Sequence, residues 1–211
     1  FLRHGGSMGL DFSYLLYFER QHLWDALQGV VAIAEKHDPP VIIHFPDREL
    51  SIPLATWVMR DKQVNFDDPD FSFDTVLRFE LDDEIEDYLG DRYYEDDRRS
   101  PPGEDDENKV YIGYIYLGIN NDLSREYPEH DVSDLVLFDF GTPGTRMSVL
   151  FSYSTSIRKT FTELLEINHG VCGVFNQEDG GGEVFWFKGK KMSVSIEDQF
   201  MLPDEIEVIL S

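Results

Sequence analysis

The order of apolar and polar positions predicts a β–α unit near the start of the chain. Residues 12–18 (FSYLLYF) form an apolar run of strand length. Apolar side chains then recur at helical spacing through 19–37, and a proline pair at 39–40 follows. Two short strands at 41–45 and 49–54 are expected next as a hairpin, because apolar and polar residues alternate in the second of them.

The same order of elements is predicted near the other end of the chain. It comprises a strand at 147–152, a helix at 155–168, and strands at 171–175 and 183–187. The chain is therefore expected to contain two β-α-β-β units, at 12–54 and 147–187. Their residues align poorly, so two independent units stay the alternative to a duplication.

Long strands are predicted between these two units. Residues 71–81 alternate strictly, which is typical of a strand with one buried and one wet face. Residues 109–120 are apolar or aromatic on both faces, and 135–140 form a further strand. The first two are expected to pair antiparallel across an acidic excursion at 82–108, which opens with a capped helical turn at 83–90.

These elements predict an α+β fold. We expect a mostly antiparallel sheet of about 8–10 strands with two main helices packed on one side. Residues 8–211 are interpreted as a single domain, and residues 1–7, which end in Gly-Gly-Ser, as a cloning remnant. No apolar run approaches the length of a membrane span, so a cytoplasmic protein without a membrane partner is expected.

The charge of the chain is large and localised. The formal net charge is −24, and residues 80–107 contribute −11 of it, from 14 acids and three arginines. Such a field repels nucleic acid phosphate and anionic lipid, and it accelerates encounter with a basic protein surface. Composition therefore indicates a basic protein as partner and argues against nucleic acid.

Candidate catalytic chemistry is sparse. The chain has no phosphate-binding glycine motif, no zinc-binding spacing and no serine-nucleophile motif. Its single cysteine, Cys172, lies in an apolar strand and is expected to be buried and unreactive. The sequence thus predicts no catalytic residue, no metal site and no cofactor, and it leans away from an enzyme.

The leading hypothesis is a non-enzymatic acidic protein that engages a basic partner. Immunity proteins that neutralise nuclease toxins follow this logic of charge and size, and here it is an analogy without a motif. The expected partner-binding residues are Asp83, Glu84, Glu86, Asp87, Glu95, Asp96, Asp97, Glu104, Asp105 and Asp106.

The alternative is a small-ligand-binding or sensor domain. If two β-α-β-β units met about a pseudo-twofold axis, aromatic side chains from both would line a groove between them, suited to an aromatic or cationic ligand. The residues expected to line that groove are Tyr14, Tyr17, Trp24, Phe185 and Trp186.

Overall fold

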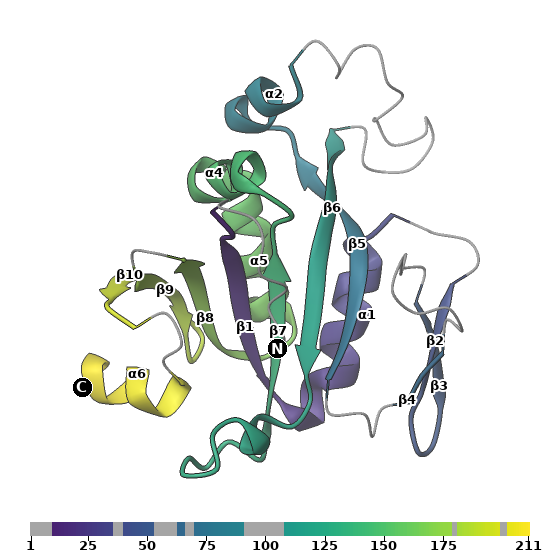
Figure 1. Ribbon diagram of the computed structural model, residues 1–211, viewed down its shortest axis with the longest axis vertical. Coiled ribbons are helices and arrows are strands. Elements are labelled where there is room, and N and C mark those ends of the chain that lie inside the picture. The colour runs from purple at the N-terminus through teal and green to yellow at the C-terminus, as the bar shows by residue number, and fades with distance from the viewer. Residues whose placement is uncertain are drawn as a thin grey trace.

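The computed structural model describes residues 10–35, 40–52, 63–65, 70–90, 108–178, 181–198 and 202–211, and it confirms the α+β class (Figure 1). The strands are β1 (Ser13–Glu19), β2 (Val41–His44), β3 (Glu49–Ile52), β4 (Gln63–Asn65), β5 (Asp70–Glu80), β6 (Lys109–Asn120), β7 (Leu135–Gly141), β8 (Gly170–Gln177), β9 (Gly181–Phe187) and β10 (Lys190–Ile196). The helices are α1 (Leu23–Ile33), α2 (Asp83–Leu89), α4 (Thr145–Tyr153), α5 (Thr155–Ile167) and α6 (Pro203–Leu210), with short 3₁₀ turns η1 (Arg20–His22) and η2 (Leu123–Arg125).

Seven of the described strands form one antiparallel sheet, in the order β10-β9-β8-β1-β7-β6-β5. The pairing of β5 with β6 is the one that alternation predicted, and it runs from Asp70 opposite Asn120 to Glu80 opposite Lys109. Phe71, Phe73 and Phe79 are buried beneath this pair, as expected. The acidic excursion therefore leaves the sheet at the common end of its two longest strands.

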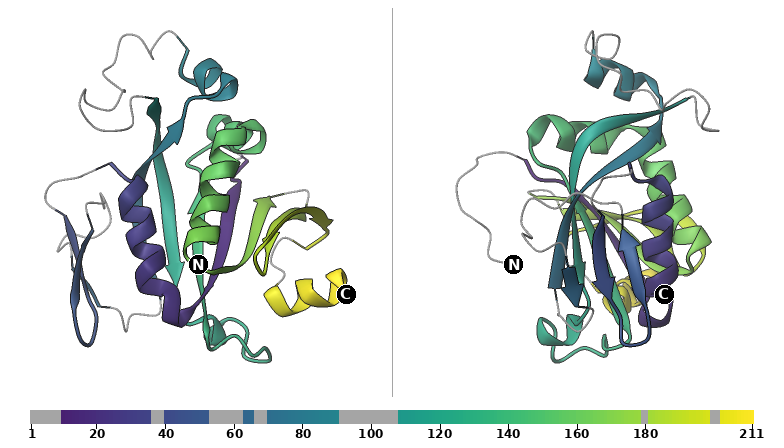
Figure 2. Two further views of the ribbon diagram at one scale, coloured as in Figure 1. Left: turned by 180° about the vertical axis from the view of Figure 1, so that it is seen from behind. Right: turned by 90° about the vertical axis from the view of Figure 1, so that its right-hand side faces the viewer.

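Two helices cover one face of this sheet, also as expected. Figure 2 (left), which views the molecule from behind, shows α1 and α5 side by side in front of the strands. They approach closely at Gly29, where a Cβ atom would lie 2.8 Å from Leu164 Cδ1 and 2.6 Å from Asn168 Nδ2. A larger side chain at Gly29 would require these two side chains to move, so the two main helices are closely packed here.

The first helix is shorter than predicted. It ends at Ile33 because Ala34 is extended and forms a bridge with Leu77, and the Glu35 amide donates to the Val76 carbonyl oxygen. Edge pairing with β5 thus replaces the last helical turn that apolar spacing indicated. The hairpin of β2 and β3 is present, but it joins β4 in a separate three-stranded sheet within the described residues.

The prediction of a strand at 147–152 is wrong, because these residues form most of α4. Met147, Leu150 and Phe151 are buried at helical spacing, whereas Val149 and Tyr153 are exposed. A short apolar run fits both periods, and packing on neighbouring elements selects the helix. The second unit is therefore α-α-β-β, and the expected pair of β-α-β-β units is not found in the described ranges.

The opposite face of the sheet carries a second apolar cluster. It includes Leu15, Tyr17 and Cys172 from the strands, and Leu202 and Ile206 beside and within α6. The helix α6 lies beside β8, β9 and β10 in Figure 1. No helix in the described ranges is long and apolar enough to cross a membrane.

Candidate functional site

The acidic side chains that the structure describes gather on α2, which projects beyond the end of the sheet (Figure 1). Ile85 and Leu89 are buried, four residues apart on one helix face. The other faces carry the exposed side chains of Asp83, Glu84, Glu86 and Asp87. A short amphipathic pattern thus holds four of the predicted partner-binding acids together in the solvent.

The remaining six predicted partner-binding residues lie outside the described residues. They are Glu95, Asp96, Asp97, Glu104, Asp105 and Asp106. Their part in binding stays a prediction from sequence.

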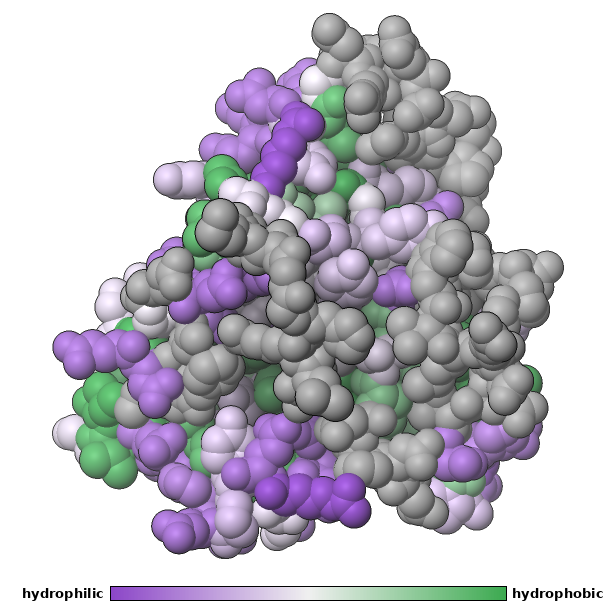
Figure 3. All heavy atoms as spheres, viewed as in Figure 1, coloured by the Kyte–Doolittle hydropathy of each residue, from purple (hydrophilic) through white to green (hydrophobic). Residues whose placement is uncertain are grey.

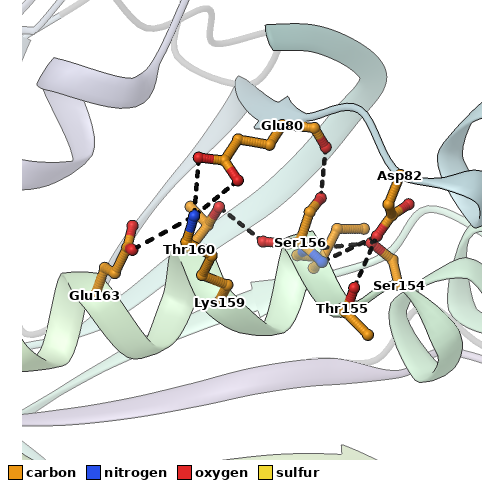
Figure 4. Close-up of polar contacts among 9 residues, drawn as sticks. Glu80, Asp82, Ser154, Thr155, Ser156, Lys159, Thr160 and Glu163 are labelled. Atoms are coloured by element: carbon orange, nitrogen blue, oxygen red, sulfur yellow. Dashed lines mark hydrogen bonds and ion pairs between the residues drawn. The ribbon is translucent and has the colours of Figure 1, made fainter. Parts of the chain in front are cut away.

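Asp82 joins α2 to the rest of the fold (Figure 4). Its Oδ1 caps α2 by accepting from the Ile85 amide at 2.9 Å. Its Oδ2 accepts from Ser154 Oγ at 2.7 Å and from the Ser156 amide at 2.9 Å, at the start of α5. Asp82 rather than the expected Asp83 is thus the N-cap, and one carboxylate holds the starts of two helices.

The pKa of Asp82 reflects this position. Partial burial favours the neutral acid, but the hydrogen bonds from Ser156, Ile85 and Ser154 favour the carboxylate and outweigh burial. The net result is a pKa below the ordinary value for aspartic acid. The junction therefore carries a negative charge at neutral pH.

A second link lies beside the first (Figure 4). Ser156 Oγ donates to the Glu80 carbonyl oxygen at 2.6 Å, and Lys159 Nζ binds both carboxylate oxygens of Glu80 at 2.9 and 2.7 Å. The hydrogen bond to Glu80 raises the pKa of Lys159. Because Glu80 at the end of β5 and Asp82 at the start of α2 are both tied to α5, α2 is held in a defined position.

A groove lies between α2 and α4. It has a volume of about 420 Å³ and is lined by Glu84, Asp87, Tyr88, Arg146, Val149, Leu150 and Tyr153. Figure 3 shows hydrophilic side chains gathered over α2, at the top of the view, and hydrophobic ones beside them over α4. Acidic and apolar groups therefore share one surface.

Arg146 closes one end of this groove. Its guanidinium lies 4.8 Å from the centre of the Tyr88 ring and donates to the Tyr88 carbonyl oxygen, in the last turn of α2. This is a favourable place for a cation, since the carbonyl end of a helix is its negative end. The groove was missed from sequence because 147–152 was interpreted as a strand, although residues 146, 149, 150 and 153 have the spacing of one helix face.

Three of the α2 acids lack the ion pairs that other acids form among the described residues. Elsewhere Glu183 pairs with Arg158 at 2.7 Å, and Glu207 pairs with Lys188 at 2.5 Å. No ion pair among the described residues involves the three α2 acids Asp83, Glu84 and Asp87. Within this part of the chain, their charge is therefore available to an external cation.

The aromatic residues of the alternative hypothesis are not gathered around one groove. Tyr14, Phe185 and Trp186 are buried in the core under the helices, and Tyr17 is buried in the cluster on the opposite face. Trp24 is half-buried and contacts Phe45 edge-on. Tyr14, Phe185 and Trp186 are enclosed because α1 and α5 cover this face of the sheet, and Tyr17 is enclosed by the cluster on the other face.

Tyr14 illustrates how completely this position is enclosed. Its ring stacks on Phe161 at 4.5 Å between centres, and its hydroxyl donates to the Phe151 carbonyl oxygen at 3.1 Å. Burial raises the pKa of Tyr14 to about 12, against the opposing effect of Arg158. The ring is a structural element of the core.

The described residues offer limited chemistry beyond charge. In these ranges no group of three or more His, Cys, Asp or Glu side chains is placed to hold a metal ion. Cys172 is buried, as predicted. No family model, curated protein or solved structure matches the chain. A functional argument therefore starts from the acidic surface and the groove.

Proposed function

We propose that this protein is a non-enzymatic acidic binding protein whose α2 surface captures a basic partner protein. The logic is that of an immunity protein, which blocks the cationic site of a toxin with correctly placed carboxylates. The observation that carries the proposal is the set of exposed acids on α2, of which Asp83, Glu84 and Asp87 form no ion pair within the described residues.

Two properties of the surface favour capture. Its charges are attached to a helix that Asp82 and Glu80 tie to α5, so little ordering of the acids is needed on binding. The chain also carries a net charge of −24, which attracts a cationic protein over a longer range than the four acids alone. The placement of the acids on α2 gives specificity, and the overall negative field increases the association rate.

The test neutralises the acids of α2 and leaves the capping residue Asp82 intact. The variant carries Asp83→Asn, Glu84→Gln, Glu86→Gln and Asp87→Asn. A basic protein captured by the immobilised parent at low ionic strength is purified, and its association rate is measured with each form. We expect the rate to fall about tenfold for the variant, because exposed charges act mainly on association.

A matched control separates local placement from overall charge. It removes four exposed acids from the connection between β6 and β7, at the opposite end of the molecule in Figure 1 (Glu126→Gln, Glu129→Gln, Asp131→Asn and Asp134→Asn). The control changes the net charge equally, but it leaves α2 intact, so it is expected to slow association far less. Equal slowing by both variants would show that α2 is not the capture surface.

A further inference from the structure

The walls of the α2–α4 groove are two helical stripes that face each other. Glu84, Asp87 and Tyr88 lie three and four residues apart on α2, and the four lining residues of α4 repeat at the same spacing. Each stripe is therefore a continuous surface along its helix. Together they form the two sides of the groove, whose volume of about 420 Å³ is large enough for a side chain of a second molecule.

The contacts at the two ends show that α2 and α4 run antiparallel. Arg146, near the start of α4, contacts Tyr88 near the end of α2. Ser154, which follows α4, contacts Asp82 at the start of α2. The groove thus has Arg146, the one cationic side chain among the described residues that line it, at one end, and its carboxylates, Asp87 and then Glu84, follow along α2 toward the other end, so a bound cation is favoured on the side away from Arg146.

The floor and the open wall of the groove are apolar. Leu150 is buried, whereas Val149 is 43% exposed and Tyr153 is 69% exposed. Exposed apolar side chains with polar groups at their rim are typical of a surface that binds another protein.

We propose that this groove receives a bulky apolar side chain of the basic partner, while an adjacent lysine or arginine of the same segment pairs with Glu84 and Asp87. The inference rests on the proposed function, and it adds the chemistry of the recognised segment: an aromatic or large aliphatic residue flanked by basic residues. Charge complementarity selects this occupant, because the chain is acidic overall and the two carboxylates of the groove form no ion pair within the described residues.

Short synthetic peptides of defined sequence test the groove directly. The first has one phenylalanine flanked by lysines, the second has glycine in place of phenylalanine, and the third has glutamates in place of the lysines. Binding is followed at low ionic strength through the methyl resonances of Val149 and Leu150. The first peptide is expected to bind about tenfold more tightly than the second, because burial of an aromatic side chain is favourable.

Variants of the protein locate the binding. Val149→Ser is expected to weaken binding of the phenylalanine peptide about fivefold, through loss of apolar contact. Val208→Ser is the matched control, since Val208 is also on a helix and is 75% exposed, but it lies on α6. Replacement of Glu84 and Asp87 by Gln and Asn is expected to weaken both lysine peptides.

The outcomes distinguish the two proposals. Equal binding of the phenylalanine and glycine peptides, with dependence on Glu84 and Asp87, overturns the groove and supports acidic capture. Equal effects of Val149→Ser and Val208→Ser also overturn the groove. Binding of the glutamate peptide as tightly as the lysine peptide overturns the charge requirement, and binding of none of the peptides counts against both proposals.

Discussion

Burial keeps two side chains of the sheet neutral. Burial is the main cause that raises the pKa of Tyr17 well above its ordinary value, and burial raises the pKa of Cys172 to about 12. Both residues belong to the apolar cluster on the face opposite α1 and α5. A neutral phenol and a neutral thiol follow, and neither is suited to act as a nucleophile near neutral pH.

The first prediction concerns the reactivity of Cys172. Because its side chain is fully buried and its thiol is protonated at pH 8, a thiol reagent is expected to modify the native protein slowly. The same reagent should react rapidly in urea at the same pH, where the chain is unfolded. The chain has one cysteine, so absorbance of the released thiolate reports this site alone. Equally fast modification in both conditions would contradict the assigned burial.

At the scale of elements, alternation of apolar and polar residues predicted a strand well, whereas a short apolar run did not distinguish a strand from a helix. The strict alternation in 71–81 correctly predicted β5 and its pairing, because only a strand places every second side chain on one buried face. The run at 147–152 fits a strand and a helix, and tertiary contacts of α4 decide between them.

The candidate site was predictable in part, because local composition is visible in the sequence and contacts between elements are not. Acid content located α2 and its four exposed carboxylates. The groove depends on which face of α4 meets α2, and the aromatic hypothesis failed to foresee that α1 and α5 would pack together at Gly29. Contacts between elements far apart in sequence leave little trace in local patterning.

The second prediction concerns the junction between α2 and α5. Asp82→Ala removes the cap of α2 and the acceptor for Ser154 and the Ser156 amide. We expect the free energy of unfolding at pH 7 to fall by about 1–2 kcal/mol, the usual range for loss of a cap and its hydrogen bonds. Urea unfolding measures it. The control is Asp83→Ala, which removes a neighbouring exposed acid outside the junction and is expected to have a much smaller effect.

The third prediction is the pH dependence of that effect. The folded pKa of Asp82 lies below its unfolded value, so the carboxylate contributes stability above the unfolded pKa, and this contribution is lost as pH falls through the folded pKa. The difference in stability between parent and Asp82→Ala is therefore expected to be largest near neutral pH and to shrink toward pH 3. A difference that stays constant from pH 7 to pH 3 would contradict the role of the charge.

At the scale of the whole molecule, one excess of negative charge has two opposite consequences. A net charge of −24 on a chain of 211 residues makes the folded state repel itself, since folding brings the carboxylates closer together. The same charge attracts a cationic partner before contact. Local pairs such as Lys159 with Glu80 relieve the repulsion within the fold, and the exposed acids of α2 keep the attraction at one place.

The last prediction follows from this opposition. Raising the ionic strength from 0.01 M to 0.15 M shortens the range of electrostatic interaction from about 30 Å to about 8 Å. Screening should therefore raise the thermal midpoint of the free protein by about a few degrees, because self-repulsion weakens. Over the same range it should slow association with the basic partner by about tenfold, because long-range attraction weakens as well. Thermal unfolding and stopped-flow association, measured in the same buffers, give both values. An association rate that is independent of salt would mean that the acidic residues act only on solubility, since electrostatic capture requires the association rate to fall while the thermal midpoint rises.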